Sequence, residues 1–316
     1  MKPFASVSEQ IETLESRGMI FNHDRQNTNF MILNNYYNVI NSPGKFFIES
    51  DNKYIEGTSF KEIIAVYEFD KALKTILFNK IIEIEAHLRS LVSYYFFKTA
   101  PDTPYNYLDP NNYSSNNDHT RKLIADLNLV IDKHKDTPGH AINHYINRHS
   151  MVPLWVLVNH LNFGTIENMI YQMKDRSDNH IAMICSQILR ENLGLNQAPT
   201  FNLKHLKSYV SAIRSLRNIL AHNNRLFWYT WKTTSYHNEL HSKYGIIERS
   251  NRNDVYNVFL VMQCFLLSEQ YAILHNTILK RIKTLSLKLH TIDVNIILNS
   301  LGFPNDWHKN NSKLPQ

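Results

Sequence analysis

Glycine and proline are scarce in this sequence of 316 residues, which contains only 8 Gly and 10 Pro. Because many-stranded β folds need frequent tight turns, this scarcity argues against a sandwich or barrel and favours long helices. The content of 43% hydrophobic and 20% charged residues is that of an ordinary folded protein, which excludes wholesale disorder. We therefore predict an all-α fold.

Cysteine and long apolar runs are also rare. The two cysteines, Cys185 and Cys264, show no pairing pattern, which predicts core packing in a reducing compartment. The longest apolar run, near Val258, is too short to cross a bilayer, and the first ten residues contain no apolar signal segment. The sequence therefore predicts a cytoplasmic protein that has no membrane partner.

The excess of positive charge is small. The chain has 34 Lys and Arg against 28 Asp and Glu, which gives a formal net charge of +6 and a pI near 9.1. This charge is compatible with a polyanionic partner and equally with an ordinary solvated surface. Charge alone leaves both interpretations open.

Residues 1–59 are predicted to form an N-terminal helical region. Ser6 or Ser8 can cap a short helix that Gly18 ends, because a side-chain oxygen can accept from the free N–H groups of the first turn. The stretch NFMILNNYYNVIN predicts a second helix, which SPGK breaks.

The next two regions differ sharply in composition. The first, 60–99, has no Gly or Pro from Phe60 to Phe97, which predicts one very long helix or two abutting helices of a bundle. The second, 100–199, is rich in turn formers and is predicted to be a helical insertion. It contains a helix at 119–134, and PLWVLVNHLNFGTIENMIYQM predicts another that is interrupted near Gly164.

Residues 200–290 are predicted to complete a helical core, and 291–316 to form a C-terminal tail. Within the core region we expect a helix from Asn202 to about His222 and a last long helix from Asn253 to Leu289. The segment from Phe60 to Phe97 should pack against both of them in a bundle.

The helix predicted to end near His222 has two chemically different faces. At about 100° per residue, one polar stripe contains Arg214, Asn218, His222 and Arg225. The opposite side is apolar, with Leu206, Tyr209, Ile213, Leu216 and Leu220. Because no acid stands near the stripe in the sequence, its positive charge is uncompensated and suits a phosphate, whereas a plain solvated face is the alternative.

Arg217, Asn218 and His222 fit the R-x-x-x-x-H motif, with Asn directly after Arg, that marks the HEPN superfamily of ribonucleases. In order and spacing, five segments resemble the Abi-like abortive-infection proteins, the AbiD and AbiF group of bacteria: SEQIETLESRGM, NNYYN, FDKAL with IEIEAHLRSLVSYYF, PLWVLVNHLNFGTI and RNILAHNNRLFW. The resemblance covers roughly Lys2 to Tyr229 and implies a HEPN-like helical bundle.

The resemblance implies a metal-independent endoribonuclease that acts as a toxin in phage defence and needs no cofactor. In this chemistry the 2′-hydroxyl of RNA attacks the adjacent phosphate, which leaves 2′,3′-cyclic phosphate and 5′-hydroxyl ends. We assign general acid–base catalysis to His222, because an imidazole exchanges protons near neutral pH. We assign phosphate stabilisation to Arg217 and orientation to Asn218, because a guanidinium presents fixed donors to phosphate oxygens.

Other residues are expected to assist this site. Contacts with RNA are expected from Arg214, Asn223, Arg225 and Lys207. Glu85 and Arg89 stand one helical turn apart and form either a plain ion pair or a support for the motif helix.

Two histidine-rich stretches show weaker patterns. In HNELH, His237 and His241 are expected at the surface, since Glu239 is third where the HExxH metalloprotease pattern has its glutamate second. In HAINH, which begins at His140, no Cys or acid is spaced to complete a metal site with His149.

Arg217 and His222 are five residues apart, or roughly 140° around a regular helix, so one helix presents them poorly to one phosphate. The chain has one credible motif, and the resemblance implies a composite site across a twofold axis; we therefore expect a homodimer. The resemblance also implies control by an inhibitory noncoding RNA or another antitoxin. The alternative function is a non-catalytic RNA- or protein-binding module on the same scaffold.

Overall fold

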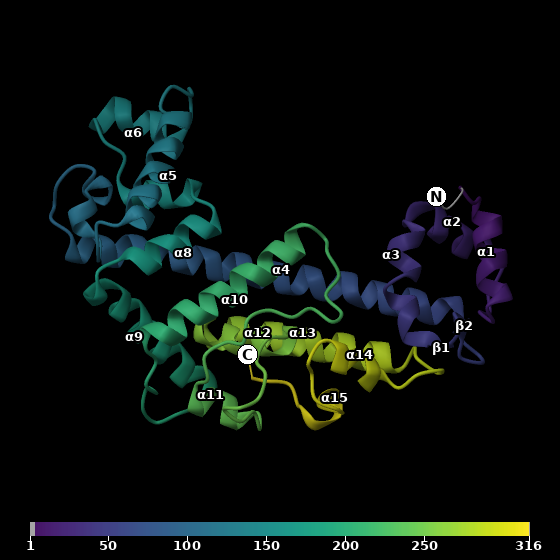
Figure 1. The fold of residues 1–316 in the computed structure, drawn as a ribbon. Coiled ribbons are helices and arrows are strands. Elements are labelled where there is room, and N and C mark those ends of the chain that lie inside the picture. Colours follow the sequence, from purple (N-terminus) through teal and green to yellow (C-terminus); the bar gives the residue numbers. More distant parts are fainter. Residues whose placement is uncertain (1–3, 316) are drawn as a thin grey trace.

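The computed structural model describes residues 4–315 and all of their side chains except those of residues 175 and 176. Within this range the chain forms fifteen α-helices and a single small hairpin, which confirms the predicted all-α fold (Figure 1). The hairpin pairs β1 (Ile48–Ser50) with β2 (Lys53–Tyr54) and lies beside the N-terminal helices.

Helix α4 (Phe60–Thr99) is one continuous helix that runs through the length of the molecule (Figure 1). The sequence left open one helix or two, and the structure has one. Its buried side chains recur every three or four residues through Leu77, Ile81, Ile84 and Leu88. Helices α9, α10 and α13 pack along it, so α4 is the axis of the bundle.

The N-terminal helices pack against the first half of α4. They are α1 (Val7–Ser16), α2 (Arg25–Leu33), α3 (Tyr36–Ile40) and the 3₁₀ turn η1 (Pro43–Phe47). Of the two predicted caps, Ser6 is the one that caps α1. The prediction of one helix across NFMILNNYYNVIN is wrong. Asn34 is the C-cap of α2, where its backbone N–H and its side-chain amide both donate to the carbonyl of Phe30. The side chain of Asn35 then accepts from the backbone N–H of Tyr37 and starts α3 as a separate helix.

The chain between 100 and 199 supplies helices both to the far end of α4 and to the bundle (Figure 1). The elements are η2 (Asn106–Leu108), η3 (Pro110–Asn112), α5 (Asp118–His134), α6 (Ala141–His149), α7 (Leu154–Leu157), η4 (Val158–His160), α8 (Phe163–Gln172) and α9 (Asp175–Leu193). The interruption expected near Gly164 lies at Leu161 and Asn162, and Asn162 caps α8. Helix α9, which the sequence analysis did not assign, packs along α4.

Helices α10 (Leu203–Ala221) and α13 (Ser268–Ser286) pack against α4, as predicted. The single helix predicted from Asn253 to Leu289 is wrong, because the chain forms α12 (Val255–Val261), the turn η5 (Met262–Cys264) and α13. Asn192 of α9 donates its amide to the carbonyls of Gln263 and Leu266, at 2.7 and 2.8 Å. Those carbonyls are therefore satisfied by a side chain at the point where a helix would use them.

The remaining helices close the lower face of the bundle: α11 (Asn238–Lys243), α14 (Val294–Ser300) and α15 (Trp307–Asn310). Trp307 is buried in the core, and both cysteines are free and buried, which confirms their predicted packing role. Over residues 4–315, no helix combines the length and apolar character that a membrane crossing requires.

Candidate active site at the end of helix α10

The predicted catalytic histidine is the residue at which α10 ends. His222 is the C-cap, and the backbone N–H groups of Asn223 and Asn224 donate back to the carbonyls of Leu220 and Ile219, at 3.1 and 3.0 Å. This pair of bonds is a Schellman motif, in which Asn223 takes the left-handed conformation, with a φ of 50°. The cap therefore holds the imidazole of His222 at an exposed corner of the bundle.

Asn218 lies one turn before His222, and both side chains are exposed. Neither side chain forms a hydrogen bond with any residue in the described range. Their spacing places them on one side of α10, as the wheel predicted, because residues four apart on a helix are neighbours. This amide and this imidazole are therefore available to a ligand.

The helical wheel misplaced Arg225. Since α10 ends at Ala221, Arg225 lies in the turn beyond the helix, and its position on the polar stripe is wrong. Its guanidinium carbon is 5.8 Å from the ring centre of Trp228, which is itself about half exposed. The chain thus turns the cation of Arg225 toward an aromatic ring.

Arg217 faces a buried carboxylate of α4. The Nε atom of Arg217 is 3.9 Å from Oε2 of Glu85, and Nη2 of Arg89 is 2.5 Å from Oε1 of the same carboxylate. Nη2 of Arg89 also donates to the carbonyl of Leu161, at 3.0 Å. Glu85 is only 4% exposed, whereas about a third of the Arg217 side chain (33%) reaches solvent. The carboxylate of Glu85 therefore lies between the two arginines, and Arg89 connects it to the backbone just before α8.

Arg214 pairs with a second buried carboxylate, which the sequence analysis missed. Its Nε atom contacts Oε2 of Glu167 on α8, and the hydroxyl of Tyr171 donates to Oε1 of Glu167 at 2.9 Å. The expectation of uncompensated charge along the stripe is therefore wrong for Arg214, and Arg217, which lies beside the stripe, also faces a carboxylate. Both acids lie on other helices, so local sequence spacing does not reveal them.

A sequence signal for these two acids nevertheless exists. Glu85 follows Ile81 by four residues and precedes Leu88 by three, so it occupies a core position of α4. Glu167 has the same relation to Phe163 and Ile170 on α8. An acid at the apolar face of a helix needs a buried partner, because an unpaired buried charge is costly.

The two other predicted RNA-binding residues lie at opposite ends of α10. Asn223 accepts a hydrogen bond from Nζ of Lys74 on α4, at 3.3 Å. Lys207 lies near Asp178 of α9, with 3.7 Å between Nζ and Oδ2. Lys207 precedes His222 by about four turns, or about 22 Å along the helix axis, so the two cannot contact one phosphate.

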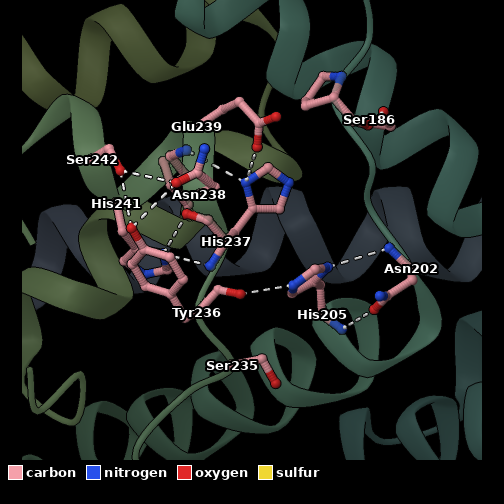
Figure 2. A network of polar contacts seen from close by, with 12 residues as sticks. Ser186, Asn202, His205, Ser235, Tyr236, His237, Asn238, Glu239, His241 and Ser242 are labelled. Carbon is pink, nitrogen blue, oxygen red and sulfur yellow. Dashed lines mark hydrogen bonds and ion pairs between the residues drawn. The ribbon is translucent and has the colours of Figure 1, made fainter. Parts of the chain in front are cut away.

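A buried histidine cluster anchors the start of α10 (Figure 2). Nδ1 of His205 accepts from the backbone N–H of Asn202, and its Nε2 lies 2.9 Å from the carbonyl of Tyr236. His237 and His241 are 1% and 0% exposed, so the prediction that they lie at the surface is wrong. They are buried because the loop that carries them folds back over the first turns of α10.

Burial favours the neutral form of the histidines in this cluster. It lowers the pKa of His237 to about 4, and the neighbouring His205 adds to the effect. Burial also lowers the pKa values of His205 and His241. In the neutral form, Nδ1 of His237 accepts from the backbone N–H of Leu240, at 3.4 Å.

The other histidine-rich stretch forms a stack of rings at the far end of the molecule. The rings of His134 and His140 are 4.0 Å apart at their centres, and His160 is 4.4 Å from His140. Among the residues described, no three His, Cys, Asp or Glu side chains are arranged to hold a metal ion.

Comparison with known proteins identifies one family. The family model described as "Abi-like protein" matches residues 26–228, which is more than half of the chain. The match includes helices α4, α8 and α10. It therefore contains the buried acids Glu85 and Glu167 as well as the predicted catalytic residues. No curated protein and no solved structure matches the chain.

Proposed function

Because the chain belongs to the Abi-like protein family, we propose that it is a metal-independent endoribonuclease of bacterial phage defence. The family itself suggests a role in abortive infection. The ribonuclease activity is our proposal, and it rests on a HEPN-type reading of Arg217, Asn218 and His222. The expected targets are cellular RNAs. We expect an antitoxin to keep the enzyme inactive until infection.

The observation that carries the proposal is the exposed imidazole of His222 at the end of α10, one turn after exposed Asn218 and close in sequence to a positioned arginine. Glu85 restrains Arg217 from the buried side, while part of the guanidinium side chain stays open to solvent. Cleavage at a phosphate requires a group that exchanges protons and a fixed cation that stabilises the developing charge, and the amide can orient the reacting groups.

The chemistry needs one proton removed and one delivered. The 2′-oxygen of RNA loses its proton to an imidazole and attacks the adjacent phosphorus, and the bond from phosphorus to the 5′-oxygen breaks. The imidazole, now protonated, donates that proton to the departing oxygen. We propose that His222 of one subunit exchanges this proton in a composite site of a homodimer, in which Arg217 of the other subunit stabilises the charge on the phosphate.

One observation favours a second function. Arg214 and Arg217 both face buried carboxylates, so their positive charges are partly neutralised within the protein. A non-catalytic RNA- or protein-binding module would also place such pairs beneath an exposed helix face. The two functions differ in their product, because a binding module releases its RNA intact.

The test is incubation of the purified protein with total cellular RNA in EDTA, followed by mapping of the RNA ends. The proposal expects new 2′,3′-cyclic phosphate and 5′-hydroxyl ends with the wild-type protein and none with His222→Ala. Intact RNA in both samples, with RNA retained by the wild-type protein, would support the binding module. Cleavage that disappears in EDTA would overturn metal-independent chemistry.

A further inference from the structure

A polar groove begins at the turn that follows His222. It has a volume of about 690 Å³, within the range of sites that hold small molecules or single nucleotides. One wall is α3 with the residues after it, the other is the first half of α4, and the end is closed by Asn223, Asn224 and Arg225. The predicted catalytic motif and the groove therefore share one turn of chain.

Amide and aromatic side chains dominate the lining. Asn38, Asn41 and Asn79 line the two walls, and Tyr37 stands at the groove with 68% of its surface exposed. An amide can donate and accept at once, which matches the edges of nucleobases. A tyrosine ring offers a flat surface on which a base can stack.

The groove is physically connected to the motif. Nζ of Lys74 is 2.6 Å from Oδ2 of Asp70 and donates to Oδ1 of Asn223 at 3.3 Å. Lys74 therefore ties the floor of the groove to the residue directly after His222. A ligand that settles in the groove therefore contacts the turn that directly follows His222.

We propose that this groove holds an unpaired nucleotide of RNA beside the phosphate on which His222 acts. The inference rests on the proposed function and adds to it the single-stranded character of the substrate. It also adds residues of α3 and α4 to the RNA contacts. The strand must be unpaired, because in a duplex the Watson–Crick edges are occupied by the opposite base.

Binding of a fluorescein-labelled single-stranded oligoribonucleotide, measured by anisotropy in the His222→Ala background, tests the groove without interference from cleavage. Tyr37→Ala and Asn79→Ala should each weaken binding by about fivefold or more, since they remove a stacking surface and a base contact. Asn79 is an exposed residue of α4, and alanine is the better helix former, so its loss of binding cannot reflect a damaged helix.

Matched controls lie elsewhere on the molecule. Tyr94→Ala removes a tyrosine that is 61% exposed near the far end of α4, and Asn147→Ala removes an exposed amide of α6. Both control variants should bind like the parent protein. The same oligoribonucleotide annealed to its complement should bind at least about tenfold more weakly than the single strand.

The outcomes separate the two proposals. If the groove variants bind like the controls, or the duplex binds as well as the single strand, the inference is overturned, whether or not the wild-type protein cuts RNA. If the groove variants lose binding while the wild-type protein cuts nothing, the groove stands as an RNA site and the nuclease proposal falls. A protein that binds no RNA overturns both.

Discussion

The Oε2 atom of Glu85 lies 3.9 Å from the Nε atom of Arg217, across the contact between α4 and α10. Glu85 is buried and pairs at the same time with Arg89 on its own helix. This relationship joins the axis of the bundle to the predicted phosphate-binding arginine. Of the two interpretations of Glu85 and Arg89, a plain ion pair or a support for the motif helix, the contact with Arg217 favours the second.

Glu85→Gln should lower the free energy of unfolding by roughly 3 kcal/mol, because it leaves the charges of Arg89 and Arg217 without their buried counter-charge. Urea denaturation measures this change. Glu83→Gln is the control on the same helix, since Glu83 is one-third exposed (35%) and pairs with Lys80, an arrangement worth about 0–1 kcal/mol. Equal stability of the two variants would show that the buried pair contributes nothing beyond a surface pair.

His222→Ala should abolish cleavage and leave RNA affinity nearly unchanged. The imidazole is exposed and forms no hydrogen bond within the described range, so its removal should also leave the melting temperature unchanged. Cleavage and filter-binding assays measure the two properties side by side. His119→Ala, which alters an exposed histidine of α5, should keep full activity. A variant that loses binding as completely as cleavage would remove the case for a catalytic role.

A composite site in a dimer predicts complementation. Arg217→Ala and His222→Ala proteins should each be inactive. After subunit exchange at equal concentration, a mixed dimer has one site that combines the intact Arg217 of one subunit with the intact His222 of the other, so part of the cleavage should return. Activity should also fall on dilution, as dimers dissociate. Wild-type protein that cuts at full specific activity as a demonstrated monomer would exclude the shared site.

Arg225→Ala should weaken RNA binding for all sequences to a similar degree and reduce the slope of log affinity against log salt by about 1, because one phosphate contact is lost. The measurement is a salt titration of binding to the His222→Ala protein and to its double variant. Arg249→Ala, in an exposed position after α11, should leave the slope as it was. An unchanged slope for Arg225→Ala would place this residue outside the RNA contact.

Stability should fall as the pH drops from about 6.5 toward 4. Burial lowers the pKa of His237 to about 4, so the unfolded chain binds a proton in this window and the folded chain does not. The contribution of His237 to stability is therefore fully present above the pKa of this histidine in the unfolded chain. Roughly 2 kcal/mol of this contribution should be lost between pH 7 and pH 5.

The groups around His237 set the control for this experiment. They are Glu239, with 3.4 Å between Oε2 and Nδ1, the rings of His205 and His241, and Arg252 beside Tyr236. His237→Asn keeps a side-chain acceptor for the first turn of α11 and removes the titration. Urea denaturation at both pH values should show a smaller loss for this variant, and an equal loss would exclude His237 as its source.

Local patterns in the sequence were enough to predict α4 and α10 but not α9. Helix α4 and the apolar face of α10 follow from the spacing of their side chains, because a period of 3.6 residues is a property of one segment. The polar motif at the end of α10 is local in the same sense. The family match over residues 26–228 agrees with the resemblance and covers four of its five segments, since SEQIETLESRGM precedes the matched range.

Contacts between distant segments decided everything else. The amide of Asn192 interrupts the last predicted helix, Glu85 and Glu167 neutralise arginines of α10, and a returning loop buries His237. In each case the partner lies on another element, so no spacing rule within one helix can find it. The sequence alone determined which residues share a helix face, whereas only packing decided which charges stay free, because the energy of a charge depends on what surrounds it in three dimensions.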